Sequence, residues 1–287
     1  MTTAHKSRVL DMTRGDPFRL VLQFSLPLFC SNMLQQVYNL TDTALAGHLL
    51  GSAALAEIGA TAALYGLIMN FAFGMNNGLA LTVSRCFGAG EREGIRRAVG
   101  WMVTLSAAVS LVLTTVSLLG RGALLQALQV PAEVWDGAAA YLTVILLGIP
   151  LTMLYNMEAA LLRAVGNSVT PLLFLLFSSV LNVGLDAAFM GPLGMGVRGA
   201  AVATVLAQGI SAVLGAVYLV RSYPELHFTP AHFKKSARRA VMNMFWAGMS
   251  MGLMSAIYNL GSVALQSSIN ALGRLYIALY FVFTGAF

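Results

Sequence analysis

The sequence predicts an all-α protein built as a polytopic bundle of membrane-spanning helices. Charged residues make up 10% of the chain, against roughly 25% in soluble domains, and mean hydropathy is +0.77. In addition, seven stretches without Asp, Glu, Lys or Arg are each long enough to cross a hydrocarbon layer of about 30 Å as a helix. A β-barrel would instead need segments of roughly 10 residues with alternating polarity, which these stretches lack.

The uncharged stretches divide the chain into its expected parts. In order, they are residues 20–41, 58–84, 98–120, 137–157, 164–185, 199–220 and 240–273. Two basic connections, residues 85–97 and 221–239, lie between these stretches, and the second contains Pro224 and Pro230. We place a boundary between two lobes at the second connection. The expected parts are a cytoplasmic N-terminal segment 1–19, a six-helix lobe 20–221, a basic cytoplasmic inter-lobe linker 222–239 and the start of a second lobe 240–287.

The basic residues indicate how the chain lies in the membrane. If the N-terminus is cytoplasmic, 14 of the 17 Lys and Arg residues fall on the cytoplasmic side, and Arg121, Arg198 and Arg274 fall on the other. Basic loops tend to stay in the cytoplasm, so we expect a multi-pass protein of the cell membrane with a cytoplasmic N-terminus. Their scatter over four segments argues against a nucleic-acid partner, which requires a basic face.

A weak internal repeat predicts a second lobe. The tripeptide Tyr38-Asn39-Leu40 recurs as Tyr258-Asn259-Leu260, six stretches later. The two copies would run in the same direction, as parallel repeats in transporters do. A complete second copy would extend well past Phe287. We therefore expect a chain truncated relative to a two-lobe protein, with a seventh helix and the start of an eighth.

Two acidic residues that border the uncharged stretches are candidates for function, because a charge inside a bilayer costs about 2.5–3.5 kcal/mol. Asp42 and Asp186 are expected at similar depths in the outer half of the membrane. Asn182 shares a helix face with Asp186, and Thr204 is expected at the same depth. Such oxygens suit a hard cation, and two close carboxyls can share a proton. The alternative is that each acid caps a helix or pairs with a loop base.

Glu158 has two candidate roles, an interfacial one and a functional one. It lies near the cytoplasmic end of its stretch, and Arg163 follows five residues later. A long charged side chain at that depth can extend to the membrane surface. An interfacial position is therefore at least as well supported as a functional one.

No enzyme motif occurs in a suitable context. The sequence contains neither a P-loop nor an HExxH signature, so we expect a protein that is not an enzyme and does not use ATP. Cys30 and Cys86 are too few for a four-ligand metal site. No cofactor is expected beyond Na⁺ or H⁺ as a coupling ion. The glycines of the 248–252 segment, like Gly74 and Gly78, are expected to allow close helix packing.

An ordered set of motifs resembles the multidrug and toxic compound extrusion (MATE) family. The motifs are Pro27 with residues 35–43, residues 163–167 before Pro171, Asn182 with Asp186, and residues 194–204. The resemblance covers residues 14–273, which correspond to the family's N-terminal lobe and the start of its C-terminal lobe.

This resemblance implies a twelve-helix antiporter that exchanges Na⁺ or H⁺ for small organic cations. It implies that Asp42, Asn182, Asp186 and Thr204 form the cation site, including a possible Na⁺ site, and that Tyr141 lies nearby. Two alternatives stay open: a lipid or polysaccharide flippase of a related superfamily, and a membrane fragment without transport of its own. Substrate identity, the coupling ion and the oligomeric state cannot be derived from the sequence.

Overall fold

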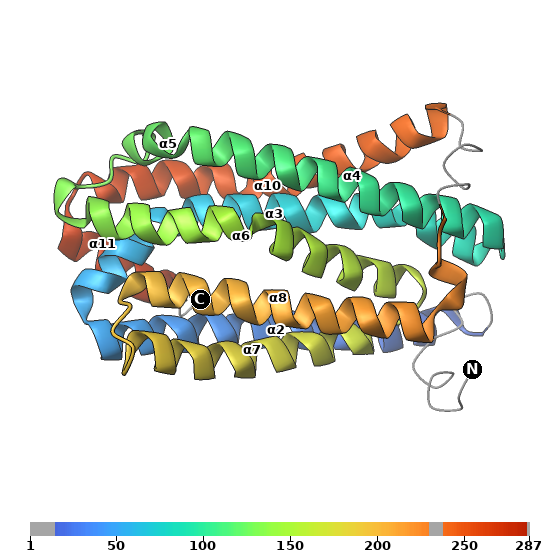
Figure 1. Cartoon of the computed structure of the whole chain (residues 1–287), viewed down its shortest axis with the longest axis horizontal. Helices are drawn as coiled ribbons and strands as arrows, with labels where there is room; N and C mark the ends of the chain where they lie inside the picture. The colour runs from blue at the N-terminus through green and yellow to red at the C-terminus, as the bar shows by residue number, and fades with distance from the viewer. Residues whose placement is uncertain (1–14, 230–237, 286–287) are drawn as a thin grey trace.

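The computed structural model describes residues 15–229 and 238–285, and this part of the chain is almost entirely helical (Figure 1). The long helices run along the longest axis of the molecule and alternate in direction. The elements in chain order are α2 (Pro17–Leu50), α3 (Ser52–Gly88), α4 (Arg92–Leu119), α5 (Arg121–Ala127), η1 (Ala132–Val134), α6 (Trp135–Ala164), α7 (Val169–Met190), α8 (Val197–Ser222), η2 (Pro224–Leu226), α10 (Arg238–Asn270) and α11 (Arg274–Gly285).

Local sequence sets the ends of these helices. The Asp16 side chain caps α2 by accepting a hydrogen bond from the Phe18 backbone N–H (3.1 Å), and Pro17 at the first helical position needs no such partner. Gly51 separates α2 from α3 with φ of +81°, a conformation that side chains disfavour. Within α6, Pro150 removes a backbone donor, and the helix bends near its middle (Figure 1).

The connections define two ends of the bundle. We call the end that carries Arg85, Arg92, Arg163, Arg221 and Arg238 the basic end; it lies on the right in Figure 1. The opposite end carries the α2–α3 turn, α5 and the start of α11, and we call it the far end. These five arginines are among the basic residues that the sequence analysis placed on the cytoplasmic side of the membrane.

Six helices among the described residues are long and apolar enough to cross a membrane: α3, α4, α6 together with η1, α7, α8 and α10. The sequence predicts seven spans, and the stretch that differs is the first. α2 is long enough at 34 residues, but Asn32, Gln35, Gln36 and Asn39 lower its hydropathy. These polar groups belong to a helix that lines a cavity, as described below.

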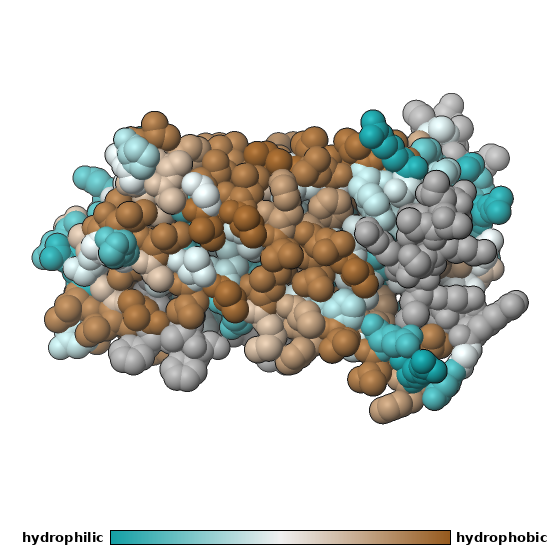
Figure 2. Space-filling model, turned by 90° about the horizontal axis from the view of Figure 1, so that it is seen from below, coloured by the Kyte–Doolittle hydropathy of each residue, from teal (hydrophilic) through white to brown (hydrophobic). Residues whose placement is uncertain are grey.

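The outer surface agrees with a helical bundle in lipid. Hydrophobic side chains cover the middle of the face in Figure 2, and hydrophilic ones gather toward both ends. Large apolar residues such as Leu111, Val116 and Val180 are more than half exposed. A water-soluble protein would not expose so wide an apolar band. The chain is therefore a multi-pass helical membrane protein.

Helix α10 packs against α3 through glycines for which the sequence predicts close helix packing. A Cβ atom on Gly78 would lie 2.5 Å from the Ala247 carbonyl oxygen and 2.7 Å from Cα of Gly248. On the other helix, a Cβ on Gly252 would lie 3.0 Å from the Phe71 ring. The two backbones approach this closely because small residues face each other, a common device between membrane helices.

Buried hydrogen bonds hold α10 at the far end. Asn270 Nδ2 donates to the backbone carbonyls of Ala60 (3.1 Å) and Leu128 (2.7 Å). Its Oδ1 accepts from Gln266 Nε2 (2.8 Å). The helix of the expected second lobe is thus fixed to α3 and to the loop after α5. The predictions for residues 1–14, for the central part of the linker, 230–237, and for 286–287 lie outside the described residues.

Candidate functional site: two carboxyls at a cavity

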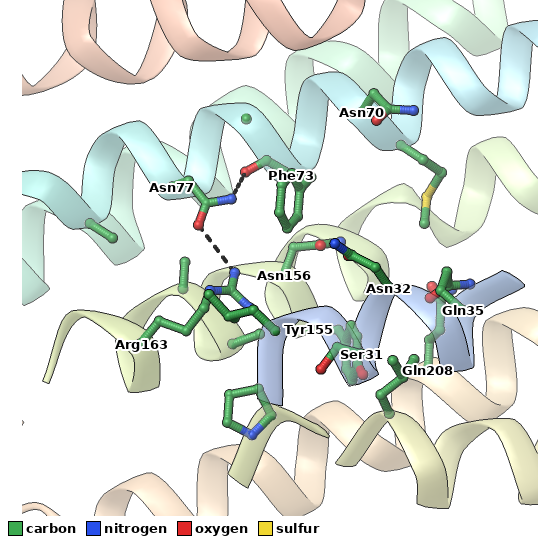
Figure 3. Close-up of a pocket in the computed structure, with 18 of the residues that line it drawn as sticks. Ser31, Asn32, Gln35, Asn70, Phe73, Asn77, Tyr155, Asn156, Arg163 and Gln208 are labelled. Carbon is green, nitrogen blue, oxygen red and sulfur yellow. Dashed lines mark hydrogen bonds between the residues drawn. The ribbon is translucent and has the colours of Figure 1, made fainter. Parts of the chain in front are cut away.

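A cavity of about 1540 Å³ runs between α2, α3, α6, α7, α8 and α10. Its wall contains Asp42 toward the far end and Arg163 toward the basic end. Figure 3 shows the part lined by the amide and hydroxyl side chains of Ser31, Asn32, Gln35, Asn70, Asn77, Asn156 and Gln208, with the rings of Phe73 and Tyr155 among them. The wall is therefore a mixture of aromatic and neutral polar groups.

Asp42 and Asp186 meet across two neighbouring helices. Asp42 belongs to α2 and Asp186 to α7, which pack side by side (Figure 1). Asp186 is completely buried, whereas Asp42 reaches the cavity. The two carboxyl groups lie close together, and neither oxygen of Asp186 has a hydrogen-bond partner among the described residues.

The other predicted residues surround this pair. Asn182 is buried one helical turn before Asp186, and its Nδ2 donates to Thr204 Oγ1 of α8 (3.4 Å). Asn182 also lies beside the Asp186 carboxyl, without a well-directed hydrogen bond to it. Tyr141 is buried next to Asp42 and Asp186. The structure thus brings together all five residues that the sequence singles out.

Three further residues complete the surroundings and were missed by the sequence analysis. Tyr38 lies beside Thr204 and near Asp42, and Tyr65 lies next to Asp42 and Gln208. Helical spacing could have indicated two of them, since Tyr38 precedes Asp42 by four residues and Gln208 follows Thr204 by four. No comparable signal pointed to Tyr65, which comes from another helix.

Several oxygen atoms in this cluster lack a donor. Oδ1 of Asp42, Oδ1 of Asn182 and both carboxyl oxygens of Asp186 are buried without a hydrogen-bond partner among the described residues. Buried polar atoms normally have a partner. An all-oxygen set with two carboxyls fits a hard cation such as Na⁺, or a proton held between the acids. Within the described ranges, no group of three His, Cys, Asp or Glu residues suggests a transition metal.

Arg163 has partners inside the cavity. Its Nη2 donates to Asn77 Oδ1 (3.1 Å), as the dashed line in Figure 3 shows, and its guanidinium lies 5.5 Å from the centre of the Phe73 ring. Asn77 in turn donates to the Phe73 carbonyl oxygen (2.8 Å). The positive charge is thus tied to α3 by a hydrogen bond and a cation–π contact.

Glu158 does not occupy the interfacial position considered from its sequence. Its side chain is 4% exposed and lies between α6 and α8. Arg163, five residues later, turns into the cavity toward Asn77. Glu158 is therefore a third buried carboxyl, on the basic-end side of the pair.

The MatE family model matches residues 27–188, more than half of the chain. The chain belongs to the MatE family. The match includes Asp42, Asn182 and Asp186 and ends before Thr204.

Relatives of this MatE chain are described as multidrug resistance proteins. It is 28% identical over 266 residues to the probable multidrug resistance protein YpnP of Bacillus subtilis (strain 168), covering 93% of this chain and 59% of that protein. It is 29% identical over 196 residues to the probable multidrug resistance protein NorM of Thermotoga maritima, covering 67% and 42%. The MatE chain thus spans 59% of the first relative and 42% of the second, about half the length of each.

Solved MATE structures share its fold. A MATE crystal structure in complex with MaL6 superposes with a TM-score of 0.78 at 26% identity, covering 91% of this chain and 56% of that one. The inward-facing conformation of a MATE family multidrug resistance transporter gives a TM-score of 0.79 at 25% identity, covering 90% and 60%. The helix arrangement of the MatE chain is therefore that of the corresponding part of these MATE structures.

Proposed function

We propose that this chain is a cation-coupled exporter of organic cations, in which Asp42 and Asp186 bind the coupling ion. The observation that carries the proposal is the set of unpartnered oxygens on Asp42, Asp186 and Asn182, next to Thr204. An intramembrane acid without a permanent partner is expensive to maintain and is usually functional.

The chemistry of the pair supports an exchange mechanism. Two carboxylates in a poorly hydrated place repel each other, so binding one H⁺ or Na⁺ between them is strongly favourable. A positively charged substrate near Asp42 would compete with that ion for the same negative charge. Release of the ion and binding of the substrate would then alternate, which is the basis of antiport.

The cavity wall supports an amphiphilic organic cation as the substrate. Aromatic rings such as Phe73 and Tyr155 provide apolar and cation–π surface. Asp42 supplies a negative charge at the wall, as does Glu225 near the basic end, and Arg163 is already engaged with Asn77. Multidrug resistance is also the activity in the names of the relatives.

The arginine distribution supports an orientation for the exporter in the cell membrane. By the positive-inside rule, the basic end and the N-terminus would face the cytoplasm. Residues at the basic end, among them Ser84, Gly88 and Arg163, line the cavity. Substrates would then enter from the cytoplasm and pass toward the carboxyl pair.

The proposal predicts that efflux depends on an ion gradient. Cells that lack their own multidrug exporters are loaded with ethidium, with and without the chain, and fluorescence loss is followed. We expect the chain to accelerate efflux, and dissipation of both the proton and the sodium gradient, with ATP maintained, to abolish the difference. Efflux that persists at an unchanged rate without either gradient, or no difference between the two cell lines, would contradict the proposal.

A further inference from the structure

Glu158 is a buried acid outside the Asp42–Asp186 pair, and the exchange proposed above gives it no role. Its side chain is 4% exposed, and Oε1 has no hydrogen-bond partner among the described residues. A carboxyl group without partners in such a place is costly to keep. Replacement by an apolar residue of similar size would remove that cost, so we infer that the acid has a function.

Helix α8 is shaped to accommodate this carboxyl. A Cβ atom on Gly215 would collide with Oε2 of Glu158. Ser211, one helical turn earlier on the same face of α8, is 1% exposed and its hydroxyl also lacks a partner in the described part of the chain. A second unpartnered polar group thus lies close to the acid along the same interface.

The face of α8 that carries these residues leads back to the carboxyl pair. Thr204, Gln208, Ser211 and Gly215 follow one another at spacings of four, three and four residues, which places them on one side of a helix. Thr204 binds Asn182 beside the pair, and Gln208 Oε1 accepts a hydrogen bond from Thr152 of α6 (2.6 Å). A line of polar and small groups therefore connects the pair with Glu158.

The charged and titratable groups around Glu158 leave it unpaired. On α6 itself, Tyr155 is a neighbour, and Arg163 interacts with Tyr155 and Asn77. On α8, Tyr218 lies one turn beyond Gly215 and contacts Phe174 and Tyr223 through its ring. The neighbouring Met157 and Leu161 of α6 belong to an apolar cluster with Val99 and Met102 of α4, and Phe174 of α7 packs against it.

We propose that Glu158 is a second proton-binding carboxyl of the transport cycle, on the basic-end side of the Asp42–Asp186 pair. This inference rests on the proposed function and adds the route by which the coupling proton reaches or leaves the pair. The Glu158 carboxylate accepts one proton from water at the basic end, becomes a neutral acid and later returns the same proton to water or to the pair. The step moves one proton and no electrons.

Infrared spectroscopy of the purified chain tests this proton site without relying on transport. Difference spectra are recorded over a pH titration in detergent for the wild type, Glu158→Gln and the Asp42→Asn, Asp186→Asn double variant. We expect a protonated-carboxyl band that appears on acidification, is missing in Glu158→Gln and remains in the double variant. Glu133→Gln, which removes an exposed carboxyl, serves as the control and should leave this band unchanged.

A second variant keeps the test decisive if Glu158→Gln folds poorly. Gly215→Ala retains the acid but places a Cβ where Oε2 lies, so the band should remain and its midpoint pH should shift. Wild-type spectra in Glu158→Gln, or an unchanged midpoint in Gly215→Ala, would overturn the inference. Ethidium efflux that is unaffected in the double variant would instead overturn the proposed function, so the two failures are distinguishable.

Discussion

The Asp42→Asn, Asp186→Asn double variant is expected to reduce ion-driven ethidium efflux to the level of cells that lack the chain. Both replacements keep the shape of the side chain and remove its negative charge. Without these charges, neither H⁺ nor Na⁺ has a favourable position beside Asn182 and Thr204. Each single variant should retain a smaller, less ion-sensitive efflux, because one carboxyl can still bind one proton.

The control for this experiment is Asp136→Asn, which changes an exposed carboxyl in the first turn of α6. Efflux by this variant should match the wild type. The double variant should also reach the membrane in normal amount, since it removes a repulsive pair of buried acids. Wild-type efflux rates in the double variant would rule out the carboxyl pair as the coupling site.

The Gly78→Leu variant is expected to show the largest loss of stability. Its side chain would have to occupy the space of the Ala247 carbonyl and the Gly248 backbone, 2.5 and 2.7 Å from the position of its Cβ. Backbone atoms cannot rotate away as a side chain can, so α10 must separate from α3. We expect a loss at or above the upper end of the roughly 1–3 kcal/mol that overpacking costs, measured by thermal unfolding in detergent.

A matched glycine on the same helix pair provides the comparison. Gly261 of α10 has no atom within 4 Å of the position that a Cβ would take, so Gly261→Ala should be neutral or should stabilise α10 by about 0.5–1 kcal/mol. Equal unfolding temperatures for Gly78→Leu and Gly261→Ala would show that the close α3–α10 contact does not form.

The parts of the fold that follow from one-dimensional patterns were predictable. Uncharged stretches of sufficient length identified the helices, and the glycines indicated close helix packing, because these features depend on the chemistry of single segments. Which two helices meet at those glycines was not predicted. The first span was the exception. Asn32, Gln35 and their neighbours make α2 polar, which reflects the cavity it lines rather than a lack of helix.

The two acids of the candidate site were predictable, but the residues that surround them were not. Asp42 and Asp186 stand out because acids are rare beside apolar stretches, whereas Tyr65 reaches Gln208 only through the rotation of two helices about their axes. Glu158 shows the same limit. Its position near Arg163 and the end of its stretch suggested a membrane interface, whereas the side chain packs against α8, and such an orientation arises only in the packed structure.

The most direct test of the account is ion release on substrate binding. Purified chain in weakly buffered detergent solution is mixed with ethidium, and the free H⁺ and Na⁺ concentrations are measured in parallel. The account predicts that the wild type releases one of these ions as ethidium binds and that the Asp42→Asn, Asp186→Asn variant releases neither. Equal release from both proteins, or ethidium binding to the wild type without any release, would contradict it.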